Sequence, residues 1–586
     1  MSKFLKYVLA TIVGIFLFFI LSIILLLLMI SFSMPDLEER LANKPILRIT
    51  LNKNITERET DDVFARFTSP FSTGDAGTMG LLELRNAIKK ASNTSNIKGI
   101  LLEIKEFNAG ITQIEEIRNE LIQFKKSGKF VYAYSDNYSQ KGYYLATIAD
   151  KIFLSPHGNL EFNGLEAKVL FIAGTLERLN LKTEIFRVGE YKSAIETFTN
   201  KKMSDESKVQ TKELLNSVFN SFLDNISQAR GIKVQQLKNV ADSLMLRTAE
   251  DAKRLSFITH FAYFDSLESI IREDVGIENN KKIEYATYAD FYPMYENSNG
   301  MRKVAVVIAE GQIIMGPGKR GVIGAETFTE VINKARLDEN VKAIVIRINS
   351  PGGSALASDI IWREIDLANR TKPVIASMSD VAASGGYYIA AACDTILSHP
   401  STITGSIGVF GLILTGEEFM EDKMGITSDV VKTSPFADIG SFTREMTDKE
   451  RAIIQNSVER IYEQFLQVVA KGRDLERNDV HNVAQGRVWS GKDAAKNKLV
   501  DAFGGLDDAI KLAAQKANLD DNYSVVYLPE VEYPLINQLL MRFFGSQGKE
   551  IFEDHLGQFT PYIKSLKNLK DKVGIQMRMP YDMVID

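Results

Sequence analysis

The chain carries one segment pattern twice, and this internal repeat limits the folds open to it more than any other feature. An offset of 244 residues aligns NIKGILLEI, which begins at residue 96, with NVKAIVIRI, which begins at residue 340. The same offset aligns KTEIFRVGEYKSAIETFT, residues 182–199, with ITSDVVKTSPFADIGSFT, residues 426–443. A repeat of this length predicts two copies of one domain in tandem.

The limits of the repeat predict the domain boundaries. We place an N-terminal domain at residues 47–290 and a C-terminal domain at residues 303–530, joined by the polar segment 295–303. Residues 531–586 have no repeat partner and are interpreted as a C-terminal extension. Within this extension, YPLINQLLMRFFG is amphipathic, which is compatible with packing on a neighbour or with lying on a membrane surface.

Each copy alternates short apolar segments with longer amphipathic ones. KAIVIRI, PVIASM and DTILS have the composition of buried parallel strands. The segment after Met446 predicts a long amphipathic helix, with Thr447 as the N-cap and Glu450 completing a capping box, and a matching helix follows Ser204. Alternating strands and helices predict an α/β fold in both copies.

The N-terminus contains an apolar segment long enough to cross a membrane. Residues 7–32 carry no charged side chain, and a spanning helix needs about 20 apolar residues. Lys3 and Lys6 precede the segment, so the N-terminus is expected in the cytoplasm and the remaining chain outside. We assign residues 1–34 to a cytoplasmic tip and signal-anchor and residues 35–46 to a linker. The alternative is a cleaved signal peptide, which would have a shorter apolar region and a clear cleavage site.

Composition excludes several classes of protein. A net charge of −5 with 25% charged residues argues against a nucleic-acid-binding protein, and no nucleic acid is expected as a partner. The single cysteine, Cys393, rules out an intrachain disulfide and a cysteine cluster for a metal. It lies in the apolar run IAAACDTI, where a buried structural thiol is expected.

The two copies differ where a nucleophile would stand. SDVAASGGYYIA, residues 379–390, aligns with SDNYSQKGYYLA, in which Gln140 replaces Ser384 and Lys141 replaces Gly385. Ser384 is expected to follow a strand after a short loop and to precede a helix, so the N–H of Gly385 is free to bind an oxyanion. Ser139 lies one residue too early to substitute. The alternative is that Ser384 is an ordinary serine in a glycine loop.

A second difference concerns a glycine turn. INSPGGSA, residues 348–355, aligns with IKEFNAGI in the first copy. Pro351 fixes φ, and Gly352 and Gly353 permit a sharp turn with free N–H groups, which is suited to the second half of an oxyanion hole. The alternative is a strand-to-helix turn without a catalytic role.

A third difference supplies a base. Lys192, after the expected strand TEIFRV, stands where the second copy has Phe436. A serine nucleophile needs a base, and none of the five histidines has a suitable setting; His399, beside Pro400, is interpreted as structural. A lysine can act as a base if burial keeps it neutral, although most lysines lie on the surface. Ser406, in STITGSIGVFG, either orients this amine or is a turn serine.

Four motifs together resemble a known family. INSPGGS, SDVAASGGYYIA, PSTITGSIGVFG and FRVGEYKSAIETFTNKKMSDES, in an anchored and duplicated chain, are similar to the long, two-domain form of signal peptide peptidase A. This is a family of bacterial membrane-bound serine proteases. The resemblance extends from the anchor to about residue 530 and implies tandem Clp/crotonase-like α/β domains with a Ser–Lys dyad.

The resemblance also implies roles and partners. It implies Ser384 as nucleophile, Lys192 as general base, Ser406 as the residue assisting the lysine, and oxyanion N–H groups from Gly385 and from Gly353 or Gly352. It implies no metal or cofactor, a homotetramer, and hydrophobic signal peptides as substrates at the outer face of the bacterial inner membrane.

Two alternatives remain open at this point. A crotonase-like acyl-CoA enzyme would use the oxyanion glycines without a Ser–Lys pair and would need no anchor. An inactive membrane scaffold would need neither the oxyanion glycines nor the Ser–Lys pair. If the dyad exists, Lys192 Nζ should lie within about 3–4 Å of Ser384 Oγ. The sequence leaves open whether the two meet within one chain or between chains.

Overall fold

The computed structural model describes residues 41–59, 78–278, 280–291, 302–318, 321–520, 522–529 and 574–579, together with Tyr7, Thr11, Gly14, Ile15 and Phe18. The predicted signal-anchor at residues 7–32 and the amphipathic segment at 533–545 therefore lie largely or wholly outside the described residues. Within the described ranges, no helix has both the length and the apolar composition needed to cross a bilayer.

The first copy is built on a parallel sheet in the order β8-β6-β5-β4-β1-β9. Its strands are β1 (Ile46–Leu51), β4 (Gly99–Ile104), β5 (Phe130–Ser135), β6 (Lys151–Leu154), β8 (His260–Phe261) and β9 (Tyr285–Ala286). Its helices are α4 (Leu81–Asn93), α5 (Ile111–Lys125), α6 (Gln140–Ala146), α9 (Asp205–Arg230), α10 (Val234–Asp242), α11 (Ala249–Arg254) and α12 (Phe264–Val275).

The second copy repeats this order as β20-β16-β15-β13-β10-β21, with β17 and β19 added beside β15. Its strands are β10 (Lys303–Glu310), β13 (Val341–Ser350), β15 (Val374–Ala383), β16 (Thr395–Ser398), β17 (Ile403–Gly405), β19 (Val488–Ser490), β20 (Ala502–Phe503) and β21 (Ser524–Leu528). Its helices are α13 (Ala325–Leu337), α14 (Ala355–Asn369), α15 (Gly385–Ala390), α16 (Asp448–Arg473), α17 (Arg477–Val483), α18 (Gly491–Lys496) and α19 (Leu506–Lys516). The shared strand order confirms the predicted tandem α/β architecture, while the exact domain boundaries stay predictions.

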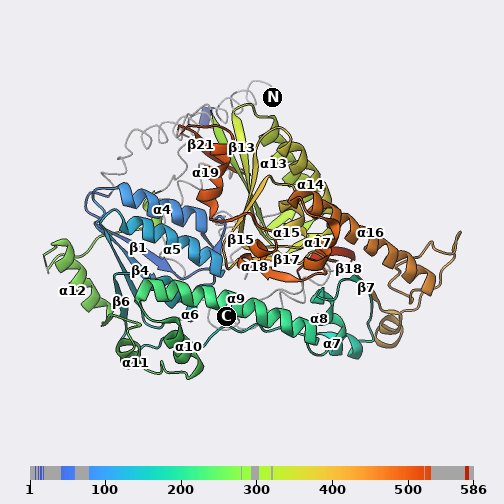
Figure 1. Ribbon diagram of the computed structural model, residues 1–586, viewed down its shortest axis with the longest axis horizontal. Coiled ribbons are helices and arrows are strands. Elements are labelled where there is room, and N and C mark those ends of the chain that lie inside the picture. The colour runs from blue at the N-terminus through green and yellow to red at the C-terminus, as the bar shows by residue number, and fades with distance from the viewer. Residues whose placement is uncertain are drawn as a thin grey trace.

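A third sheet combines segments that are far apart in the sequence. It has the order β12-β11-β14-β22-β18-β7. Its strands are β7 (Lys182–Val188), β11 (Gln312–Ile314), β12 (Val322–Gly324), β14 (Gly352–Ser354), β18 (Val409–Thr415) and β22 (Gly574–Arg578). A separate two-stranded sheet pairs β2 (Ile55–Thr56) with β3 (Met79–Gly80). In Figure 1, β7 of the first copy lies beside β18, on the far side of the second copy from β1 and β4.

The crossing of β7 is fixed by backbone pairing and apolar burial. It pairs antiparallel with β18 over its whole length, from Lys182 opposite Thr415 to Val188 opposite Val409. The chain on either side of β7 forms α7 (Ala173–Arg178) and α8 (Glu196–Thr199), and a buried apolar cluster joins these helices to β18. Its members are Leu176, Ala194, Ile195, Phe198, Phe410 and Leu412. The first copy is thereby anchored in the second.

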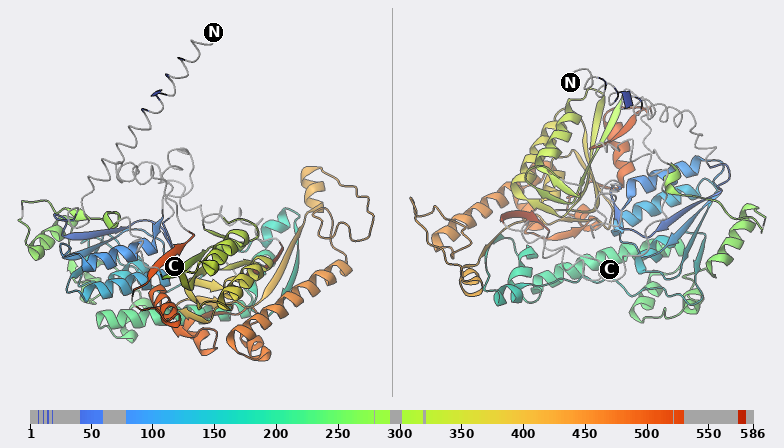
Figure 2. Two further views of the ribbon diagram at one scale, coloured as in Figure 1. Left: turned by 90° about the horizontal axis from the view of Figure 1, so that it is seen from above. Right: turned by 180° about the vertical axis from the view of Figure 1, so that it is seen from behind.

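Long helices begin where the sequence predicts and bridge the copies. Ser204 Oγ accepts the N–H of Ser207 at the start of α9, and Thr447 and Glu450 form the predicted capping box at the start of α16. Helix α9 runs along both copies in Figure 1 and in the rear view of Figure 2. Its Ser217 Oγ lies 2.7 Å from Ser490 Oγ of β19, so a helix of the first copy packs on the sheet of the second.

Candidate active site

Ser384 lies directly at the end of a strand, in an unusual backbone conformation. Strand β15 continues to Ala383, because its last residues pair with β17 from Val381 opposite Ile403 onward. The short loop expected before Ser384 is therefore absent. Ser384 has φ 56° and ψ −114°, a backbone conformation that residues other than glycine rarely adopt. Its N–H donates to the carbonyl of Gly405 at 2.8 Å. Such strain is typical of a side chain held in position for function.

Lys192 reaches this serine from the first copy. It follows β7 and precedes the short 3-10 helix η1 (Ser193–Ile195), and it is fully buried. Its Nζ lies 2.9 Å from Ser384 Oγ, 3.0 Å from Ser406 Oγ and 3.0 Å from the Ser406 carbonyl oxygen. The distance predicted between Nζ and Ser384 Oγ is confirmed, and the two residues meet within one chain.

The surroundings of Lys192 favour the neutral amine. Burial holds the pKa of Lys192 well below its ordinary value, and no charged side chain in the described part of the chain opposes this effect. A neutral amine has two N–H groups and one lone pair. The two oxygens of Ser406 accept the two N–H groups, and the lone pair then faces the hydroxyl of Ser384. This is the arrangement that a general base requires.

Ser406 is also held in a strained conformation. It follows β17 with φ 51°, and its N–H donates to the carbonyl of Arg487 at 2.7 Å. The carbonyl oxygen and Oγ of Ser406 both lie 3.0 Å from Lys192 Nζ, and the reading of Ser406 as a simple turn serine leaves these two contacts unexplained.

Three residues that the sequence did not single out position the lysine. A Cβ on Gly486 would lie 2.6 Å from Lys192 Cβ, and a Cβ on Gly408 would lie 3.2 Å from Lys192 Cδ, so both positions exclude larger side chains. Gln210 of α9 donates to the Tyr191 carbonyl at 3.2 Å and lies 3.1 Å from Ser193 Oγ. The sequence contains these glycines, but nothing in it indicates that they face Lys192.

The glycine turn packs against the start of α15. Gly352 has φ 93°, and a Cβ on it would lie 2.6 Å from the backbone nitrogen of Gly385, so only glycine fits there. The N–H of Gly352 donates to Ser350 Oγ at 3.1 Å. The N–H of Gly385, at the first position of α15, has no acceptor within the helix. The turn and the helix start thus bring two backbone segments together beside Ser384.

A model of peptidase family S49 matches residues 123–278 and 366–520, which is one segment in each copy and more than half of the chain. The chain belongs to peptidase family S49. It is 38% identical over 452 residues to Protease 4 of Salmonella typhi, covering 75% of this chain and 72% of the relative. It is 34% identical over 505 residues to the chloroplastic serine protease SPPA of Arabidopsis thaliana, covering 85% and 72%. These matches confirm a serine protease and the predicted family resemblance.

Solved structures give weaker matches. A mutant of ClpP1 from Listeria monocytogenes matches 35% of this chain and 94% of its own length, with 17% identity and a TM-score of 0.24. Among the described residues, no group of three or more His, Cys, Asp or Glu side chains could hold a metal ion.

In the first copy of the S49 chain, Gln140 occupies the position equivalent to Ser384, and its side chain is bonded to backbone groups. Gln140 Oε1 accepts the N–H groups of Asn163 and Gly164, each at 3.0 Å, and its Nε2 donates to the Gly164 carbonyl at 2.9 Å. Ser139 is the N-cap of α6 and accepts the N–H of Gly142. These side chains satisfy backbone groups, so they are structural, and the difference between the copies marks a single site.

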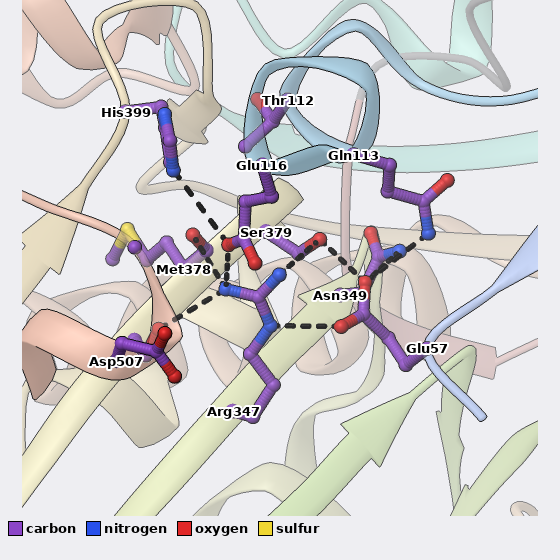
Figure 3. A network of polar contacts seen from close by, with 12 residues as sticks. Glu57, Thr112, Gln113, Glu116, Arg347, Asn349, Met378, Ser379, His399 and Asp507 are labelled. Carbon is purple, nitrogen blue, oxygen red and sulfur yellow. Dashed lines mark hydrogen bonds and ion pairs between the residues drawn. The ribbon is translucent and has the colours of Figure 1, made fainter. Parts of the chain in front are cut away.

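A buried polar network joins the two copies (Figure 3). Arg347 of β13 is fully buried, and its Nε lies 2.8 Å from Glu57 and its Nη1 2.7 Å from Glu116, both in the first copy. Its Nη2 donates to Ser379 Oγ of β15 at 3.0 Å. Strand β13 leads to the glycine turn and β15 leads to Ser384, so the network fixes both strands relative to the copy that carries Lys192.

Two further titratable groups belong to this network. Burial, together with Glu57, raises the pKa of Asp380 to about 7, and its carboxylate accepts the N–H groups of Thr112 and Gln113 at the start of α5. The ring of His399 faces Glu115 and Glu116 at 3.3 and 3.6 Å. Burial opposes its charge, but the two neighbouring carboxylates raise the pKa of His399 to about 9. These contacts agree with a structural role for His399.

Proposed function

We propose that this S49 protease is a membrane-anchored endopeptidase that hydrolyses hydrophobic peptides with a Ser384–Lys192 dyad. The observation that carries the proposal is the buried lysine amine 2.9 Å from Ser384 Oγ, with its other hydrogen-bonding capacity used by Ser406. A crotonase-like acyl-CoA enzyme would have no use for this pair, and an inactive scaffold would not retain a strained serine beside it.

In the proposed mechanism, neutral Lys192 accepts the proton of Ser384 Oγ as this oxygen attacks the carbonyl carbon of a peptide bond. Backbone N–H groups stabilise the negative charge on the carbonyl oxygen. The protonated lysine then donates its proton to the leaving amine, and a water molecule hydrolyses the ester. Ser406 accepts hydrogen bonds from the amine throughout and keeps it aligned.

We assign the oxyanion N–H groups to Gly385 and Gly353. The N–H of Gly352 is used by Ser350 Oγ, so its contribution is the shape of the turn. A Cβ on Gly353 would lie 2.0 Å from the carbonyl of Ile313, which explains why a second glycine follows the first.

We further propose that residues 7–32 anchor the protein in the bacterial inner membrane with the catalytic copies on the outer side. The anchor rests on the uncharged segment and on the lysines that precede it. A tethered protease at this surface would meet hydrophobic peptides released in the membrane, and signal peptides left after the processing of secreted proteins are the proposed substrates.

A homotetramer is proposed as the assembly. The second copy offers an unused surface, because residues 426–432, which correspond to β7, belong to no strand and expose Val431 almost completely (99%) and Val430 by half (49%). Apolar side chains exposed in this way are expected to pack on another copy of the chain. Light scattering of the purified protein should give four protomers, and Val431→Glu should lower this number; a monomeric wild type would refute the assembly.

The proposed activity is tested with two peptides of equal length, one hydrophobic and one hydrophilic. Purified wild type should hydrolyse the hydrophobic peptide at least ten-fold faster, and Ser384→Ala should hydrolyse neither. Ser139→Ala serves as the matched control, because in the repeat alignment Ser139 is one residue away from the position equivalent to Ser384. This variant should retain wild-type activity. Hydrolysis by Ser384→Ala at the wild-type rate would refute the proposed nucleophile.

A further inference from the structure

A pocket of about 670 Å³ lies between the two copies, and neither residue of the candidate dyad lines it. Helices α5 and α9 form the wall of the first copy, and the chain around the end of β16, α18 and β20 forms the wall of the second. Pockets that hold small molecules have volumes of about 300–1,000 Å³. The pocket is therefore large enough for a small organic molecule that contacts both copies.

A buried arginine on the first wall is only partly bonded. Arg118 of α5 is 4% exposed, and its Nη1 donates to the carbonyl of Tyr144 and to Thr147 Oγ1 at the end of α6. A guanidinium has five N–H groups, so those on Nε and Nη2 are left over. In the described part of the chain, nothing accepts these groups, and no carboxylate forms an ion pair with Arg118.

The other buried arginines near this junction have carboxylate partners. Arg85 of α4 lies 2.8 Å from Glu116 and 2.9 Å from Glu120, and Arg347 is likewise paired with two carboxylates. Burial opposes the charge of Arg85, but its carboxylates raise its pKa, whereas burial lowers the pKa of Arg118. Proteins seldom bury a charge without a partner, because its desolvation is costly. A partner for Arg118 is therefore expected in the pocket.

The repeat shows that the fold does not need an arginine at this position. At the offset of 244 residues, Trp362 of α14 stands in place of Arg118, and Tyr388 stands in place of Tyr144. The rings of Trp362 and Tyr388 are in edge contact, with centroids 6.2 Å apart, and Arg118 lies 4.2 Å from the ring centroid of Tyr144. An uncharged ring thus makes the same contact in the second copy, so packing alone does not explain the charge of Arg118.

Two other charged residues of the first wall already have partners. Glu115 faces the ring of His399 at 3.3 Å, and Lys125 is paired with Asp150 at 2.7 Å. These contacts engage both side chains, so the charge of Arg118 is left for a ligand.

The exposed charges of the pocket are one cation and one anion. Lys492 of α18 and Asp224 of α9 are both exposed, and neither has an ion pair among the described residues. Together with Arg118 they leave one net positive charge. The apolar side chains on the walls include Ile122, Ile148 and Phe503. The pocket therefore favours a molecule with an anionic group and an apolar part.

We propose that this pocket binds a small organic anion, whose carboxylate or phosphate group is held by Arg118 and Lys492. The guanidinium donates from Nε and Nη2, in the paired geometry that suits either group. The apolar part of the ligand lies on the aliphatic and aromatic side chains of the walls. Because Arg118 belongs to the first copy and Lys492 to the second, the bound anion joins the copies, and it stabilises the arrangement that brings Lys192 to Ser384.

The test is isothermal titration calorimetry of the full-length wild-type protein with benzoate, phenyl phosphate and the uncharged analogue benzamide. Each probe carries one phenyl ring, so the comparison isolates the charge. At least one of the two anions should bind about ten-fold more tightly than benzamide, because benzamide cannot form charge-assisted hydrogen bonds with Arg118. The tighter anion identifies the bound group as a carboxylate or a phosphate. Benzamide that binds as tightly as the anions, or no binding of either anion, overturns the proposal.

Variants of the pocket test the same site. Arg118→Gln should weaken binding of the tighter anion about ten-fold. Lys492→Gln should weaken it about three-fold, and because Lys492 is exposed this variant keeps the test valid if Arg118→Gln does not fold. Lys496→Gln is the matched control on the same helix, since Lys496 is 67% exposed, pairs with Asp493 and does not line the pocket.

The sign of the proposed charge is tested by Asp224→Asn, which removes the exposed carboxylate of the pocket. This variant should tighten anion binding, because a repulsive charge is lost. Weaker anion binding by Asp224→Asn, or unchanged binding by both Arg118→Gln and Lys492→Gln, overturns the proposal.

Discussion

Replacing Arg347 by methionine should destabilise the protein more than any surface substitution. The guanidinium is fully buried and contacts Glu57 at 2.8 Å and Glu116 at 2.7 Å. Methionine fills a similar volume but leaves two carboxylates without this partner. Removing one side of a buried ion pair costs about 3–5 kcal/mol. Because Ser379 and Gln113 still donate to Glu57, we expect the lower part of this range.

The assay is urea unfolding at neutral pH in a Ser384→Ala background, which removes the proposed nucleophile. Arg363→Met is the matched control, because Arg363 is 54% exposed in its ion pair with Asp366 and should lose less than about 1 kcal/mol. Adding Glu57→Gln to Arg347→Met should restore part of the loss, since one unpaired carboxylate is removed. A loss below about 1 kcal/mol for Arg347→Met, or an equal loss for the control, would refute the proposed role of the network.

Three further predictions concern the site and its surroundings. The pKa of Asp380 is about 7 in the folded state, whereas its ordinary value is 3.8. Between these two pH values the folded state binds one more proton than the unfolded state, so the free energy of unfolding falls as the pH rises. Asp380→Asn should reduce this fall, which urea unfolding at pH 5 and pH 8 measures. Gly486→Ala should lower peptide hydrolysis at least ten-fold, because the added Cβ would lie 2.6 Å from Lys192 Cβ and displace the lysine, and it should also lower the melting temperature, since Gly486 has φ 81°; equal hydrolysis would contradict this. Folding lowers the pKa of Lys192 from its ordinary value of 10.5, so below this pH the lysine disfavours folding, and it does so more strongly as the pH falls. Lys192→Met in the Ser384→Ala background should therefore raise the melting temperature most at low pH. An unchanged or lower melting temperature at low pH would contradict this.

The repeat predicted most of the fold and marked the positions of Ser384 and Lys192, while the role of base at Lys192 was implied by the family resemblance. Ser384 and Lys192 each stand where the other copy has a residue that cannot do the same chemistry, and the copies share strand order because they share apolar periodicity. The capping residues Ser204 and Thr447 also followed from local sequence, since a cap depends only on the residues around it.

Features that depend on distant pairing did not follow from the sequence. The pairing of β7 with β18 joins residues more than two hundred positions apart, and no local pattern specifies it. The same limit applies to β22, a five-residue strand in a segment without a repeat partner. The loop expected before Ser384 was wrong because pairing with β17 extends β15, which the residues of β15 alone do not reveal.

The proposed mechanism depends on a neutral Lys192 that activates Ser384, and the pH dependence of covalent labelling tests this most directly. The rate of reaction of the full-length protein with a fluorophosphonate probe is measured across the pH range for wild type, Ser384→Ala and Lys192→Ala. We predict no labelling of Ser384→Ala, slow labelling of Lys192→Ala, and a wild-type rate that rises with pH to a plateau, with a midpoint well below the ordinary lysine pKa of about 10.4. Labelling of Lys192→Ala at the wild-type rate, or a wild-type midpoint at the ordinary lysine value, would contradict a neutral lysine base.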